Sequence, residues 1–160
     1  MAGLYFEQFE VNKVFRHEIR RTVTESDNVW FCGATYNSAQ IHIDAEYCAT
    51  TEFGKPLVNS IFTLGLVIGL SIQDTTLGTT IANLGMTDTR FPKPVFAGDT
   101  IHSVTTVVEL RDSKSRPTTG IVTFRHEGFN QRGELVCTSL RQALMMRSPV
   151  ARPAEAVSAS

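Results

Sequence analysis

The sequence predicts a single α+β domain in which one curled antiparallel sheet wraps around a buried helix. Three observations lead to this fold. Residues 57–72 form an apolar run of helical length, residues 79–146 are rich in Thr, Val, Ile and Phe, and 160 residues suit one core. A helix that is apolar on every side must be surrounded by protein, and the strands that follow it are the available cover.

We expect the domain to occupy residues 1–147 and the tail, residues 148–160, to be disordered, since its small residues and prolines have little to bury. A formal net charge of −1 gives no field that would gather nucleic acid or an anionic membrane. The three cysteines form no C-x-x-C pair, which argues against zinc or disulfides and favours a reducing cytoplasm. The acidic N-terminal segment lacks the cations of a signal peptide, so export is not expected.

The first third of the chain indicates extended backbone followed by two short helices. Residues 12–24 set apolar side chains among charges, as in an extended segment. Thr24 with Asp27 has the form of a helix N-cap, and an apolar stretch follows it. Residues 34–41 have no period and predict a loop, after which Asp44 can cap a second short helix.

The central helix is expected to begin near Ser60, because Asn59 and Ser60 supply N-cap chemistry at the start of the apolar run. We expect Gly65 and Gly69 to let the sheet approach this helix closely. Partial alternation then predicts four strands, at residues 79–88, 100–110, 120–129 and 134–146, with a hairpin at 130–133. One copy would leave sheet edges exposed, so we expect a homodimer or higher homo-oligomer.

The loop before the central helix carries the most specific motif. Residues 35–44 read Thr-Tyr-Asn-Ser-Ala-Gln-Ile-His-Ile-Asp, and a Phe-Gly pair precedes the helix. This motif resembles the hydratase signature Gly-Asp-x-Asn-Pro-x-His-x-Asp of the MaoC-like dehydratases. His42 and Asp44 fall on the family's His and second Asp, and Asn37 stands where the family usually has Asp.

Further segments support the resemblance, which runs from about Tyr5 to Met146. Residues 91–100 look like the family's Pro-Val-x-x-Gly-Asp-Thr turn, and residues 54–66 with 113–117 are closest in wording to the itaconyl-coenzyme A and mesaconyl-coenzyme A hydratases. The resemblance implies the hot-dog fold and a hydro-lyase. Its substrate would be a short enoyl-thioester of coenzyme A with a carboxylated five-carbon acyl group, and no cofactor or metal is implied.

Hydration of such a thioester needs a base for the water, an acid for the α-carbon and donors for the enolate-like oxygen. His42 suits the first two roles, because imidazole can accept and donate a proton near neutral pH. The start of the central helix, at Asn59 and Ser60, offers unpaired backbone N–H groups to the thioester oxygen. Loop and helix start are therefore expected to face each other.

Two motif residues have two interpretations each. Asn37 cannot take a proton as Asp can, so it either orients water through its carbonyl or fills a turn. Asp44 either assists His42 or caps the following helix, and the cap is favoured.

Several cations are candidates for the coenzyme A phosphates or the substrate carboxylate, because Arg and Lys hold such groups. They are Arg90, Lys93, Lys114 and Arg116. Arg116 is our first choice, since it lies between Ser115 and Pro117 in a loop between predicted strands.

Two other functions stay open. A hot-dog thioesterase commonly carries a carboxylate on or near the central helix, and residues 60–72 have none, although Asp44 remains. A non-catalytic acyl-coenzyme A-binding subunit is the second alternative, because Asn37 replaces the family's Asp.

Overall fold

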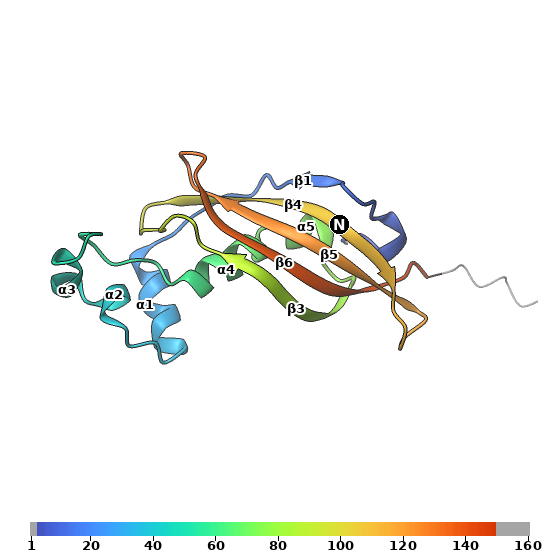
Figure 1. Ribbon diagram of the computed structural model, residues 1–160, viewed down its shortest axis with the longest axis horizontal. Coiled ribbons are helices and arrows are strands. Elements are labelled where there is room, and N and C mark those ends of the chain that lie inside the picture. The colour runs from blue at the N-terminus through green and yellow to red at the C-terminus, as the bar shows by residue number, and fades with distance from the viewer. Residues whose placement is uncertain (1–2, 150–160) are drawn as a thin grey trace, which may run out of the picture.

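A computed structural model of the chain describes residues 3–149. One face of a six-stranded antiparallel sheet packs on the central helix α4, and helices α1, α2 and α3 gather beyond one end of the sheet (Figure 1). This is the hot-dog arrangement that the sequence predicts. The helices are η1 (Phe6–Gln8), α1 (Glu25–Ala34), α2 (Gln40–Ile43), α3 (Ala45–Ala49), α4 (Ser60–Gly69) and α5 (Ile72–Thr75). The strands are β1 (Val14–Arg16), β2 (Arg21–Thr22), β3 (Thr80–Arg90), β4 (Thr100–Asp112), β5 (Thr119–Phe129) and β6 (Leu135–Met146).

The sheet has the order β1-β4-β5-β6-β3, and β2 pairs with β4. The four long strands confirm the predicted ones to within two residues at each end. The hairpin between β5 and β6 is confirmed too: Asn130 Oδ1 accepts from the N–H groups of Arg132 and Glu134 at 3.0 and 3.1 Å. Gly133 takes a φ of +75°, which glycine adopts at little cost.

Helix α4 places its apolar side chains against the sheet in one of two buried clusters. Val67 is fully buried there, with Leu64, Ile101 and Val136, and each such side chain contributes roughly 1.5–3 kcal/mol. The close approach occurs at Gly128 of β5, where a Cβ atom would collide with the Val67 side chain. Our expectation for Gly65 and Gly69 was wrong, because a Cβ atom at either would meet no neighbour.

The expectation that α4 is covered on all sides is also wrong for a single chain. Ile61 is 57% exposed, and Gly65 and Gly69 lie on the same bare face. The sheet ends at its edge strand β3, whose Leu84 and Met86 side chains are also exposed. One chain therefore supplies too little sheet to close around the helix.

The N-terminal region follows the capping prediction. The Thr24 hydroxyl accepts from Asp27 N–H, and the Asp27 carboxylate accepts in return from Thr24 N–H at 2.8 Å. The segment 34–41, expected to be a loop, contains the start of α2 because its turn is stabilised by backbone bonds rather than by an apolar period. Apart from Ser148 and Pro149, the tail 148–160 that we expect to be disordered lies outside the described residues. No helix in residues 3–149 is long and apolar enough to cross a bilayer.

Candidate active site

His42 lies in α2, and the backbone fixes its ring. Its Nδ1 is 2.9 Å from the carbonyl oxygen of Leu57. A carbonyl can only accept, so Nδ1 carries the proton and donates it, and Nε2 of the neutral ring keeps its lone pair. Leu57 is itself held, because its N–H donates to the Ile41 carbonyl at 3.0 Å. A half-buried imidazole in this tautomer is chemically able to accept a proton at Nε2.

A buried thiol supports the same turn. Cys48 Sγ donates to the carbonyl oxygens of Gln40 and Ile41 at 3.4 and 3.3 Å. Burial, and then the carboxylate of Asp44, raise the pKa of this thiol, so it stays protonated and able to donate. The turn that carries His42 is therefore tied to α3.

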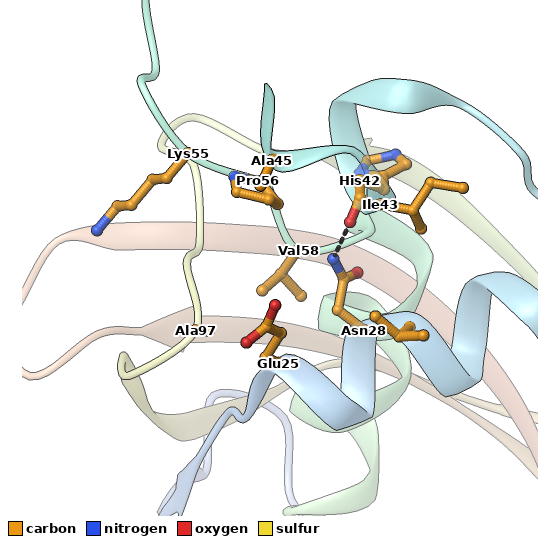
Figure 2. Close-up of a pocket in the computed structure, with 10 residues that line it drawn as sticks. Glu25, Asn28, His42, Ile43, Ala45, Lys55, Pro56, Val58 and Ala97 are labelled. Atoms are coloured by element: carbon orange, nitrogen blue, oxygen red, sulfur yellow. Dashed lines mark hydrogen bonds between the residues drawn. The ribbon is translucent and has the colours of Figure 1, made fainter. Parts of the chain in front are cut away.

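His42 borders two cavities. The helix cavity, of about 280 Å³, also contains Ser60, Thr63 and Lys93, and its remaining walls are apolar residues of segments 53–58 and 91–95 with Val136. The loop cavity, of about 190 Å³, lies between α1, the α2–α3 segment and residues 55–58 (Figure 2). His42 forms part of the wall of both.

The N-terminus of α4 opens into the helix cavity. Asn59 caps it, its Oδ1 accepting from Ile61 N–H at 2.9 Å. Within the described chain the N–H groups of Ser60 and Phe62 form no hydrogen bond, as expected of a first helical turn. These donors and the positive end of the helix dipole suit an oxygen that gains negative charge beside His42.

Asn37 and Asp44 are engaged in local structure. Asp44 Oδ1 accepts from Tyr47 N–H at 2.9 Å and its Oδ2 from the Gln40 amide at 3.2 Å, which confirms the cap. Asn37 Oδ1 accepts from Ala39 N–H at 3.1 Å, as in a turn. Neither Asn37 nor Asp44 is among the described residues that line the helix cavity or the loop cavity. Asn37 borders a separate groove, so the catalytic roles of both stay predictions.

The structure separates the candidate cations. Lys93 is the cation among the described residues that line the helix cavity. Arg90 is exposed at the end of β3. Arg116, our first choice, belongs to the connection between β4 and β5, at the end of the sheet away from α2 (Figure 1). One chain therefore brings Lys93, but not Arg116, to His42.

Sequence reasoning missed four polar residues that line the two cavities, namely Glu25, Asn28, Lys55 and Thr63. Asn28 of α1 is buried, lines the loop cavity and donates to the His42 carbonyl oxygen at 2.8 Å (Figure 2). An asparagine inside a short apolar helix was a weak signal for such a role. Among residues 3–149 no group of three or more His, Cys, Asp or Glu side chains is arranged to hold a metal ion.

Comparison with known proteins gives a family and close structural neighbours. Residues 7–128 match the family model of the MaoC like domain. The chain is 29% identical over 97% of its length to a mesaconyl-CoA hydratase of Cereibacter sphaeroides, of which it covers 45%. A MaoC-like dehydratase from Rhodospirillum rubrum superposes with a TM-score of 0.81 at 29% identity, covering 92% of this chain and 100% of that one.

A Mycobacterium tuberculosis protein described as a double hot-dog fold superposes with a TM-score of 0.83 at 26% identity. The match covers 94% of this chain and 46% of the neighbour. The chain thus spans about half the length of this neighbour and of the curated relatives that it matches first.

Proposed function

Because the chain belongs to the MaoC-like domain family, we propose that it is a hydro-lyase that adds water across the double bond of a short enoyl-coenzyme A. The observation that carries the proposal is the helix cavity, where the ring of His42 and the N-terminus of α4 border one mostly apolar space. Apolar walls lower the local dielectric and strengthen hydrogen bonds to developing charge.

In the proposed reaction, His42 Nε2 accepts a proton from water as the water oxygen bonds to the β-carbon. The electron pair of the double bond moves onto the thioester, and its oxygen becomes enolate-like. The same Nε2 then returns the proton to the α-carbon. One water is consumed, and the imidazole ends neutral, with Nδ1 still donating to Leu57.

The thioester oxygen is proposed to sit at the first turn of α4. The free N–H groups of Ser60 and Phe62 are the available donors, since Asn59 Oδ1 already occupies Ile61 N–H. Donors aimed at developing charge commonly contribute about 10²–10³ in rate.

We propose a carboxylated five-carbon acyl group, of the itaconyl or mesaconyl kind, as the substrate. Lys93 supports this choice, because it lines a cavity that is otherwise mostly apolar and its ammonium could pair with a second carboxylate. The name of the Cereibacter sphaeroides relative, a mesaconyl-CoA hydratase, points the same way.

The test is to incubate the purified chain with itaconyl-, mesaconyl- and crotonyl-coenzyme A and to follow loss of the enoyl absorbance against release of free thiol. Hydration without thiol release supports the proposal. Thiol release would assign a thioesterase, and binding without either reaction would assign an acyl-coenzyme A-binding subunit. His42→Ala should lower hydration about a hundredfold or more while circular dichroism stays unchanged. A variant that keeps more than a tenth of the activity would remove His42 as the base.

A second copy of the chain is the proposed partner, because one chain leaves both the edge strand β3 and one face of α4 uncovered. We place the protein in the cytoplasm. The free thiols of Cys32, Cys48 and Cys137 are all buried, which suits a reducing compartment.

A further inference from the structure

Asn28 joins three segments that are far apart in sequence. Asn28 is only 4% exposed. One amide group, Nδ2, donates to the carbonyl oxygens of His42 at 2.8 Å and Leu57 at 2.9 Å. Its Oδ1 accepts from Asn59 N–H, the cap of α4, at 2.8 Å. Asn28 of α1 therefore binds the backbone at His42, at Leu57, which accepts from the His42 ring, and at Asn59, which caps the central helix.

We propose that Asn28 is a positioning residue that sets the tautomer of His42 and the spacing between His42 and the N-terminus of α4. This inference rests on the proposed role of His42 as the base. The Leu57 carbonyl oxygen accepts two hydrogen bonds, one from His42 Nδ1 and one from Asn28 Nδ2. Asn28 thereby keeps this oxygen directed at the imidazole ring, which leaves Nε2 as the proton acceptor.

The position requires a primary amide of this length. It must supply two N–H donors and one acceptor within one planar group, at a residue that is only 4% exposed. Aspartate keeps the shape and the acceptor for Asn59 N–H but loses both donors. A carboxylate at position 28 would face the carbonyl oxygens of His42 and Leu57 with no hydrogen between them, and the Leu57 peptide would turn away from the ring.

A purely structural role for Asn28 predicts something different. Loss of a buried hydrogen bond lowers stability wherever it occurs, but it does not change which nitrogen of a folded histidine carries the proton. Ser71→Ala is a matched control, because the buried Ser71 hydroxyl donates to the Ile68 carbonyl at 2.7 Å at the other end of α4. The tautomer of His42 therefore separates positioning from stability.

The experiment records nitrogen-15 spectra of the imidazole rings in the wild type, Asn28→Asp, Asn28→Ala and Ser71→Ala, with His42→Ala to assign the His42 signals. We expect the Nδ1–H form of His42 in the wild type and in Ser71→Ala, and a mixture of both tautomers in the two Asn28 variants. An Nδ1–H signal that is unchanged in Asn28→Asp and Asn28→Ala would overturn the proposal.

Turnover gives a second reading of the same variants. With an enoyl-coenzyme A that the wild type hydrates, kcat should fall about tenfold or more in the Asn28 variants, KM should change less, and Ser71→Ala should keep its kcat. An equal loss in Asn28→Ala and Ser71→Ala would reduce Asn28 to a structural residue and overturn the proposal. The spectra need no substrate, so a wild type without hydratase activity would refute the proposed function and leave the tautomer test decisive for Asn28.

Discussion

The carbonyl oxygen of Leu57 governs how His42 can act, because it accepts the Nδ1 proton and leaves Nε2 free. Asn37, at the motif position where the family usually has Asp, does not contribute to this arrangement of His42. Asn37 Oδ1 accepts from the Ala39 N–H, and within the described chain Asn37 forms no hydrogen bond with His42. An amide also cannot take up and return a proton as a carboxylate can. In the proposed reaction, the imidazole of His42 alone therefore takes the proton from water and returns it to the α-carbon.

Asn37→Asp tests why this chain lacks the family's aspartate. The carboxylate can still accept from Ala39 N–H, so the turn should persist. The new negative charge would repel a substrate that carries its own carboxylate and leave an uncharged acyl group unaffected. We expect a lower kcat/KM for mesaconyl-coenzyme A and an equal or higher one for crotonyl-coenzyme A. If both substrates improve alike, the charge argument fails.

Lys93→Met tests whether Lys93 binds the second carboxylate of the proposed substrate. Methionine keeps much of the apolar stem of this lining residue of the helix cavity and removes its charge. We expect KM for mesaconyl-coenzyme A to rise about tenfold or more, with a small change for crotonyl-coenzyme A. Arg116→Ala is the control, since its loop lies at the other end of the sheet. The same selective loss in Arg116→Ala would mean that this arginine reaches the site from a second copy.

At the scale of elements, the sequence predicted what local pattern encodes. Alternation set the four long strands, and Thr24 with Asp27 marked the start of α1. Asn28 escaped prediction because its acceptors at His42 and Leu57 come from remote segments that only the fold brings together. The partial exposure of α4 escaped it as well, because an apolar helix has the same pattern whether its own sheet or a second chain covers it.

The contact between α4 and β5 gives a prediction at this scale. Gly128→Ala puts a methyl group against Val67, so we expect a loss of about 1–3 kcal/mol in the free energy of unfolding. Gly33→Ala in α1 meets no neighbour and should be neutral or stabilising by up to about 1 kcal/mol. Urea unfolding followed by circular dichroism measures both. Equal stabilities of the two variants would contradict this account of the packing.

Across the whole molecule, a buried polar chain lies between the two hydrophobic clusters. His17 forms two hydrogen bonds, one between Nδ1 and Asp74 Oδ2 at 2.7 Å and one between Nε2 and the Thr105 hydroxyl oxygen at 2.9 Å. The Thr105 hydroxyl lies 3.0 Å from His126 Nδ1. Burial first, and then the charges of Arg141 and His17, lower the pKa of His126 to about 3.

This pKa makes stability depend on pH. Between an unfolded pKa of about 6.5 and the folded value of about 3, the unfolded state binds the proton more readily, so stability falls as pH falls through this window. The slope from His126 alone approaches about 1.4 kcal/mol per pH unit. Urea unfolding at pH 7, 6 and 5 measures it, and His126→Gln should flatten the curve. A wild type that is equally stable at pH 7 and pH 5 would contradict the prediction.

The uncovered surface of one chain leads to the last prediction. Apolar side chains are exposed on the edge strand β3, among them Leu84 at 47% and Met86 at 39%, and Ile61 of α4 is 57% exposed. A second copy that pairs along β3 would satisfy the free hydrogen-bonding groups of this edge and cover its exposed side chains. Leu84→Glu should therefore convert a dimer to a monomer in size-exclusion chromatography with light scattering. Leu77→Glu, with a similarly exposed leucine outside β3, should stay dimeric. A wild type that runs as a monomer would contradict the predicted dimer, and a Leu84→Glu variant that remains dimeric would show that the interface does not use β3.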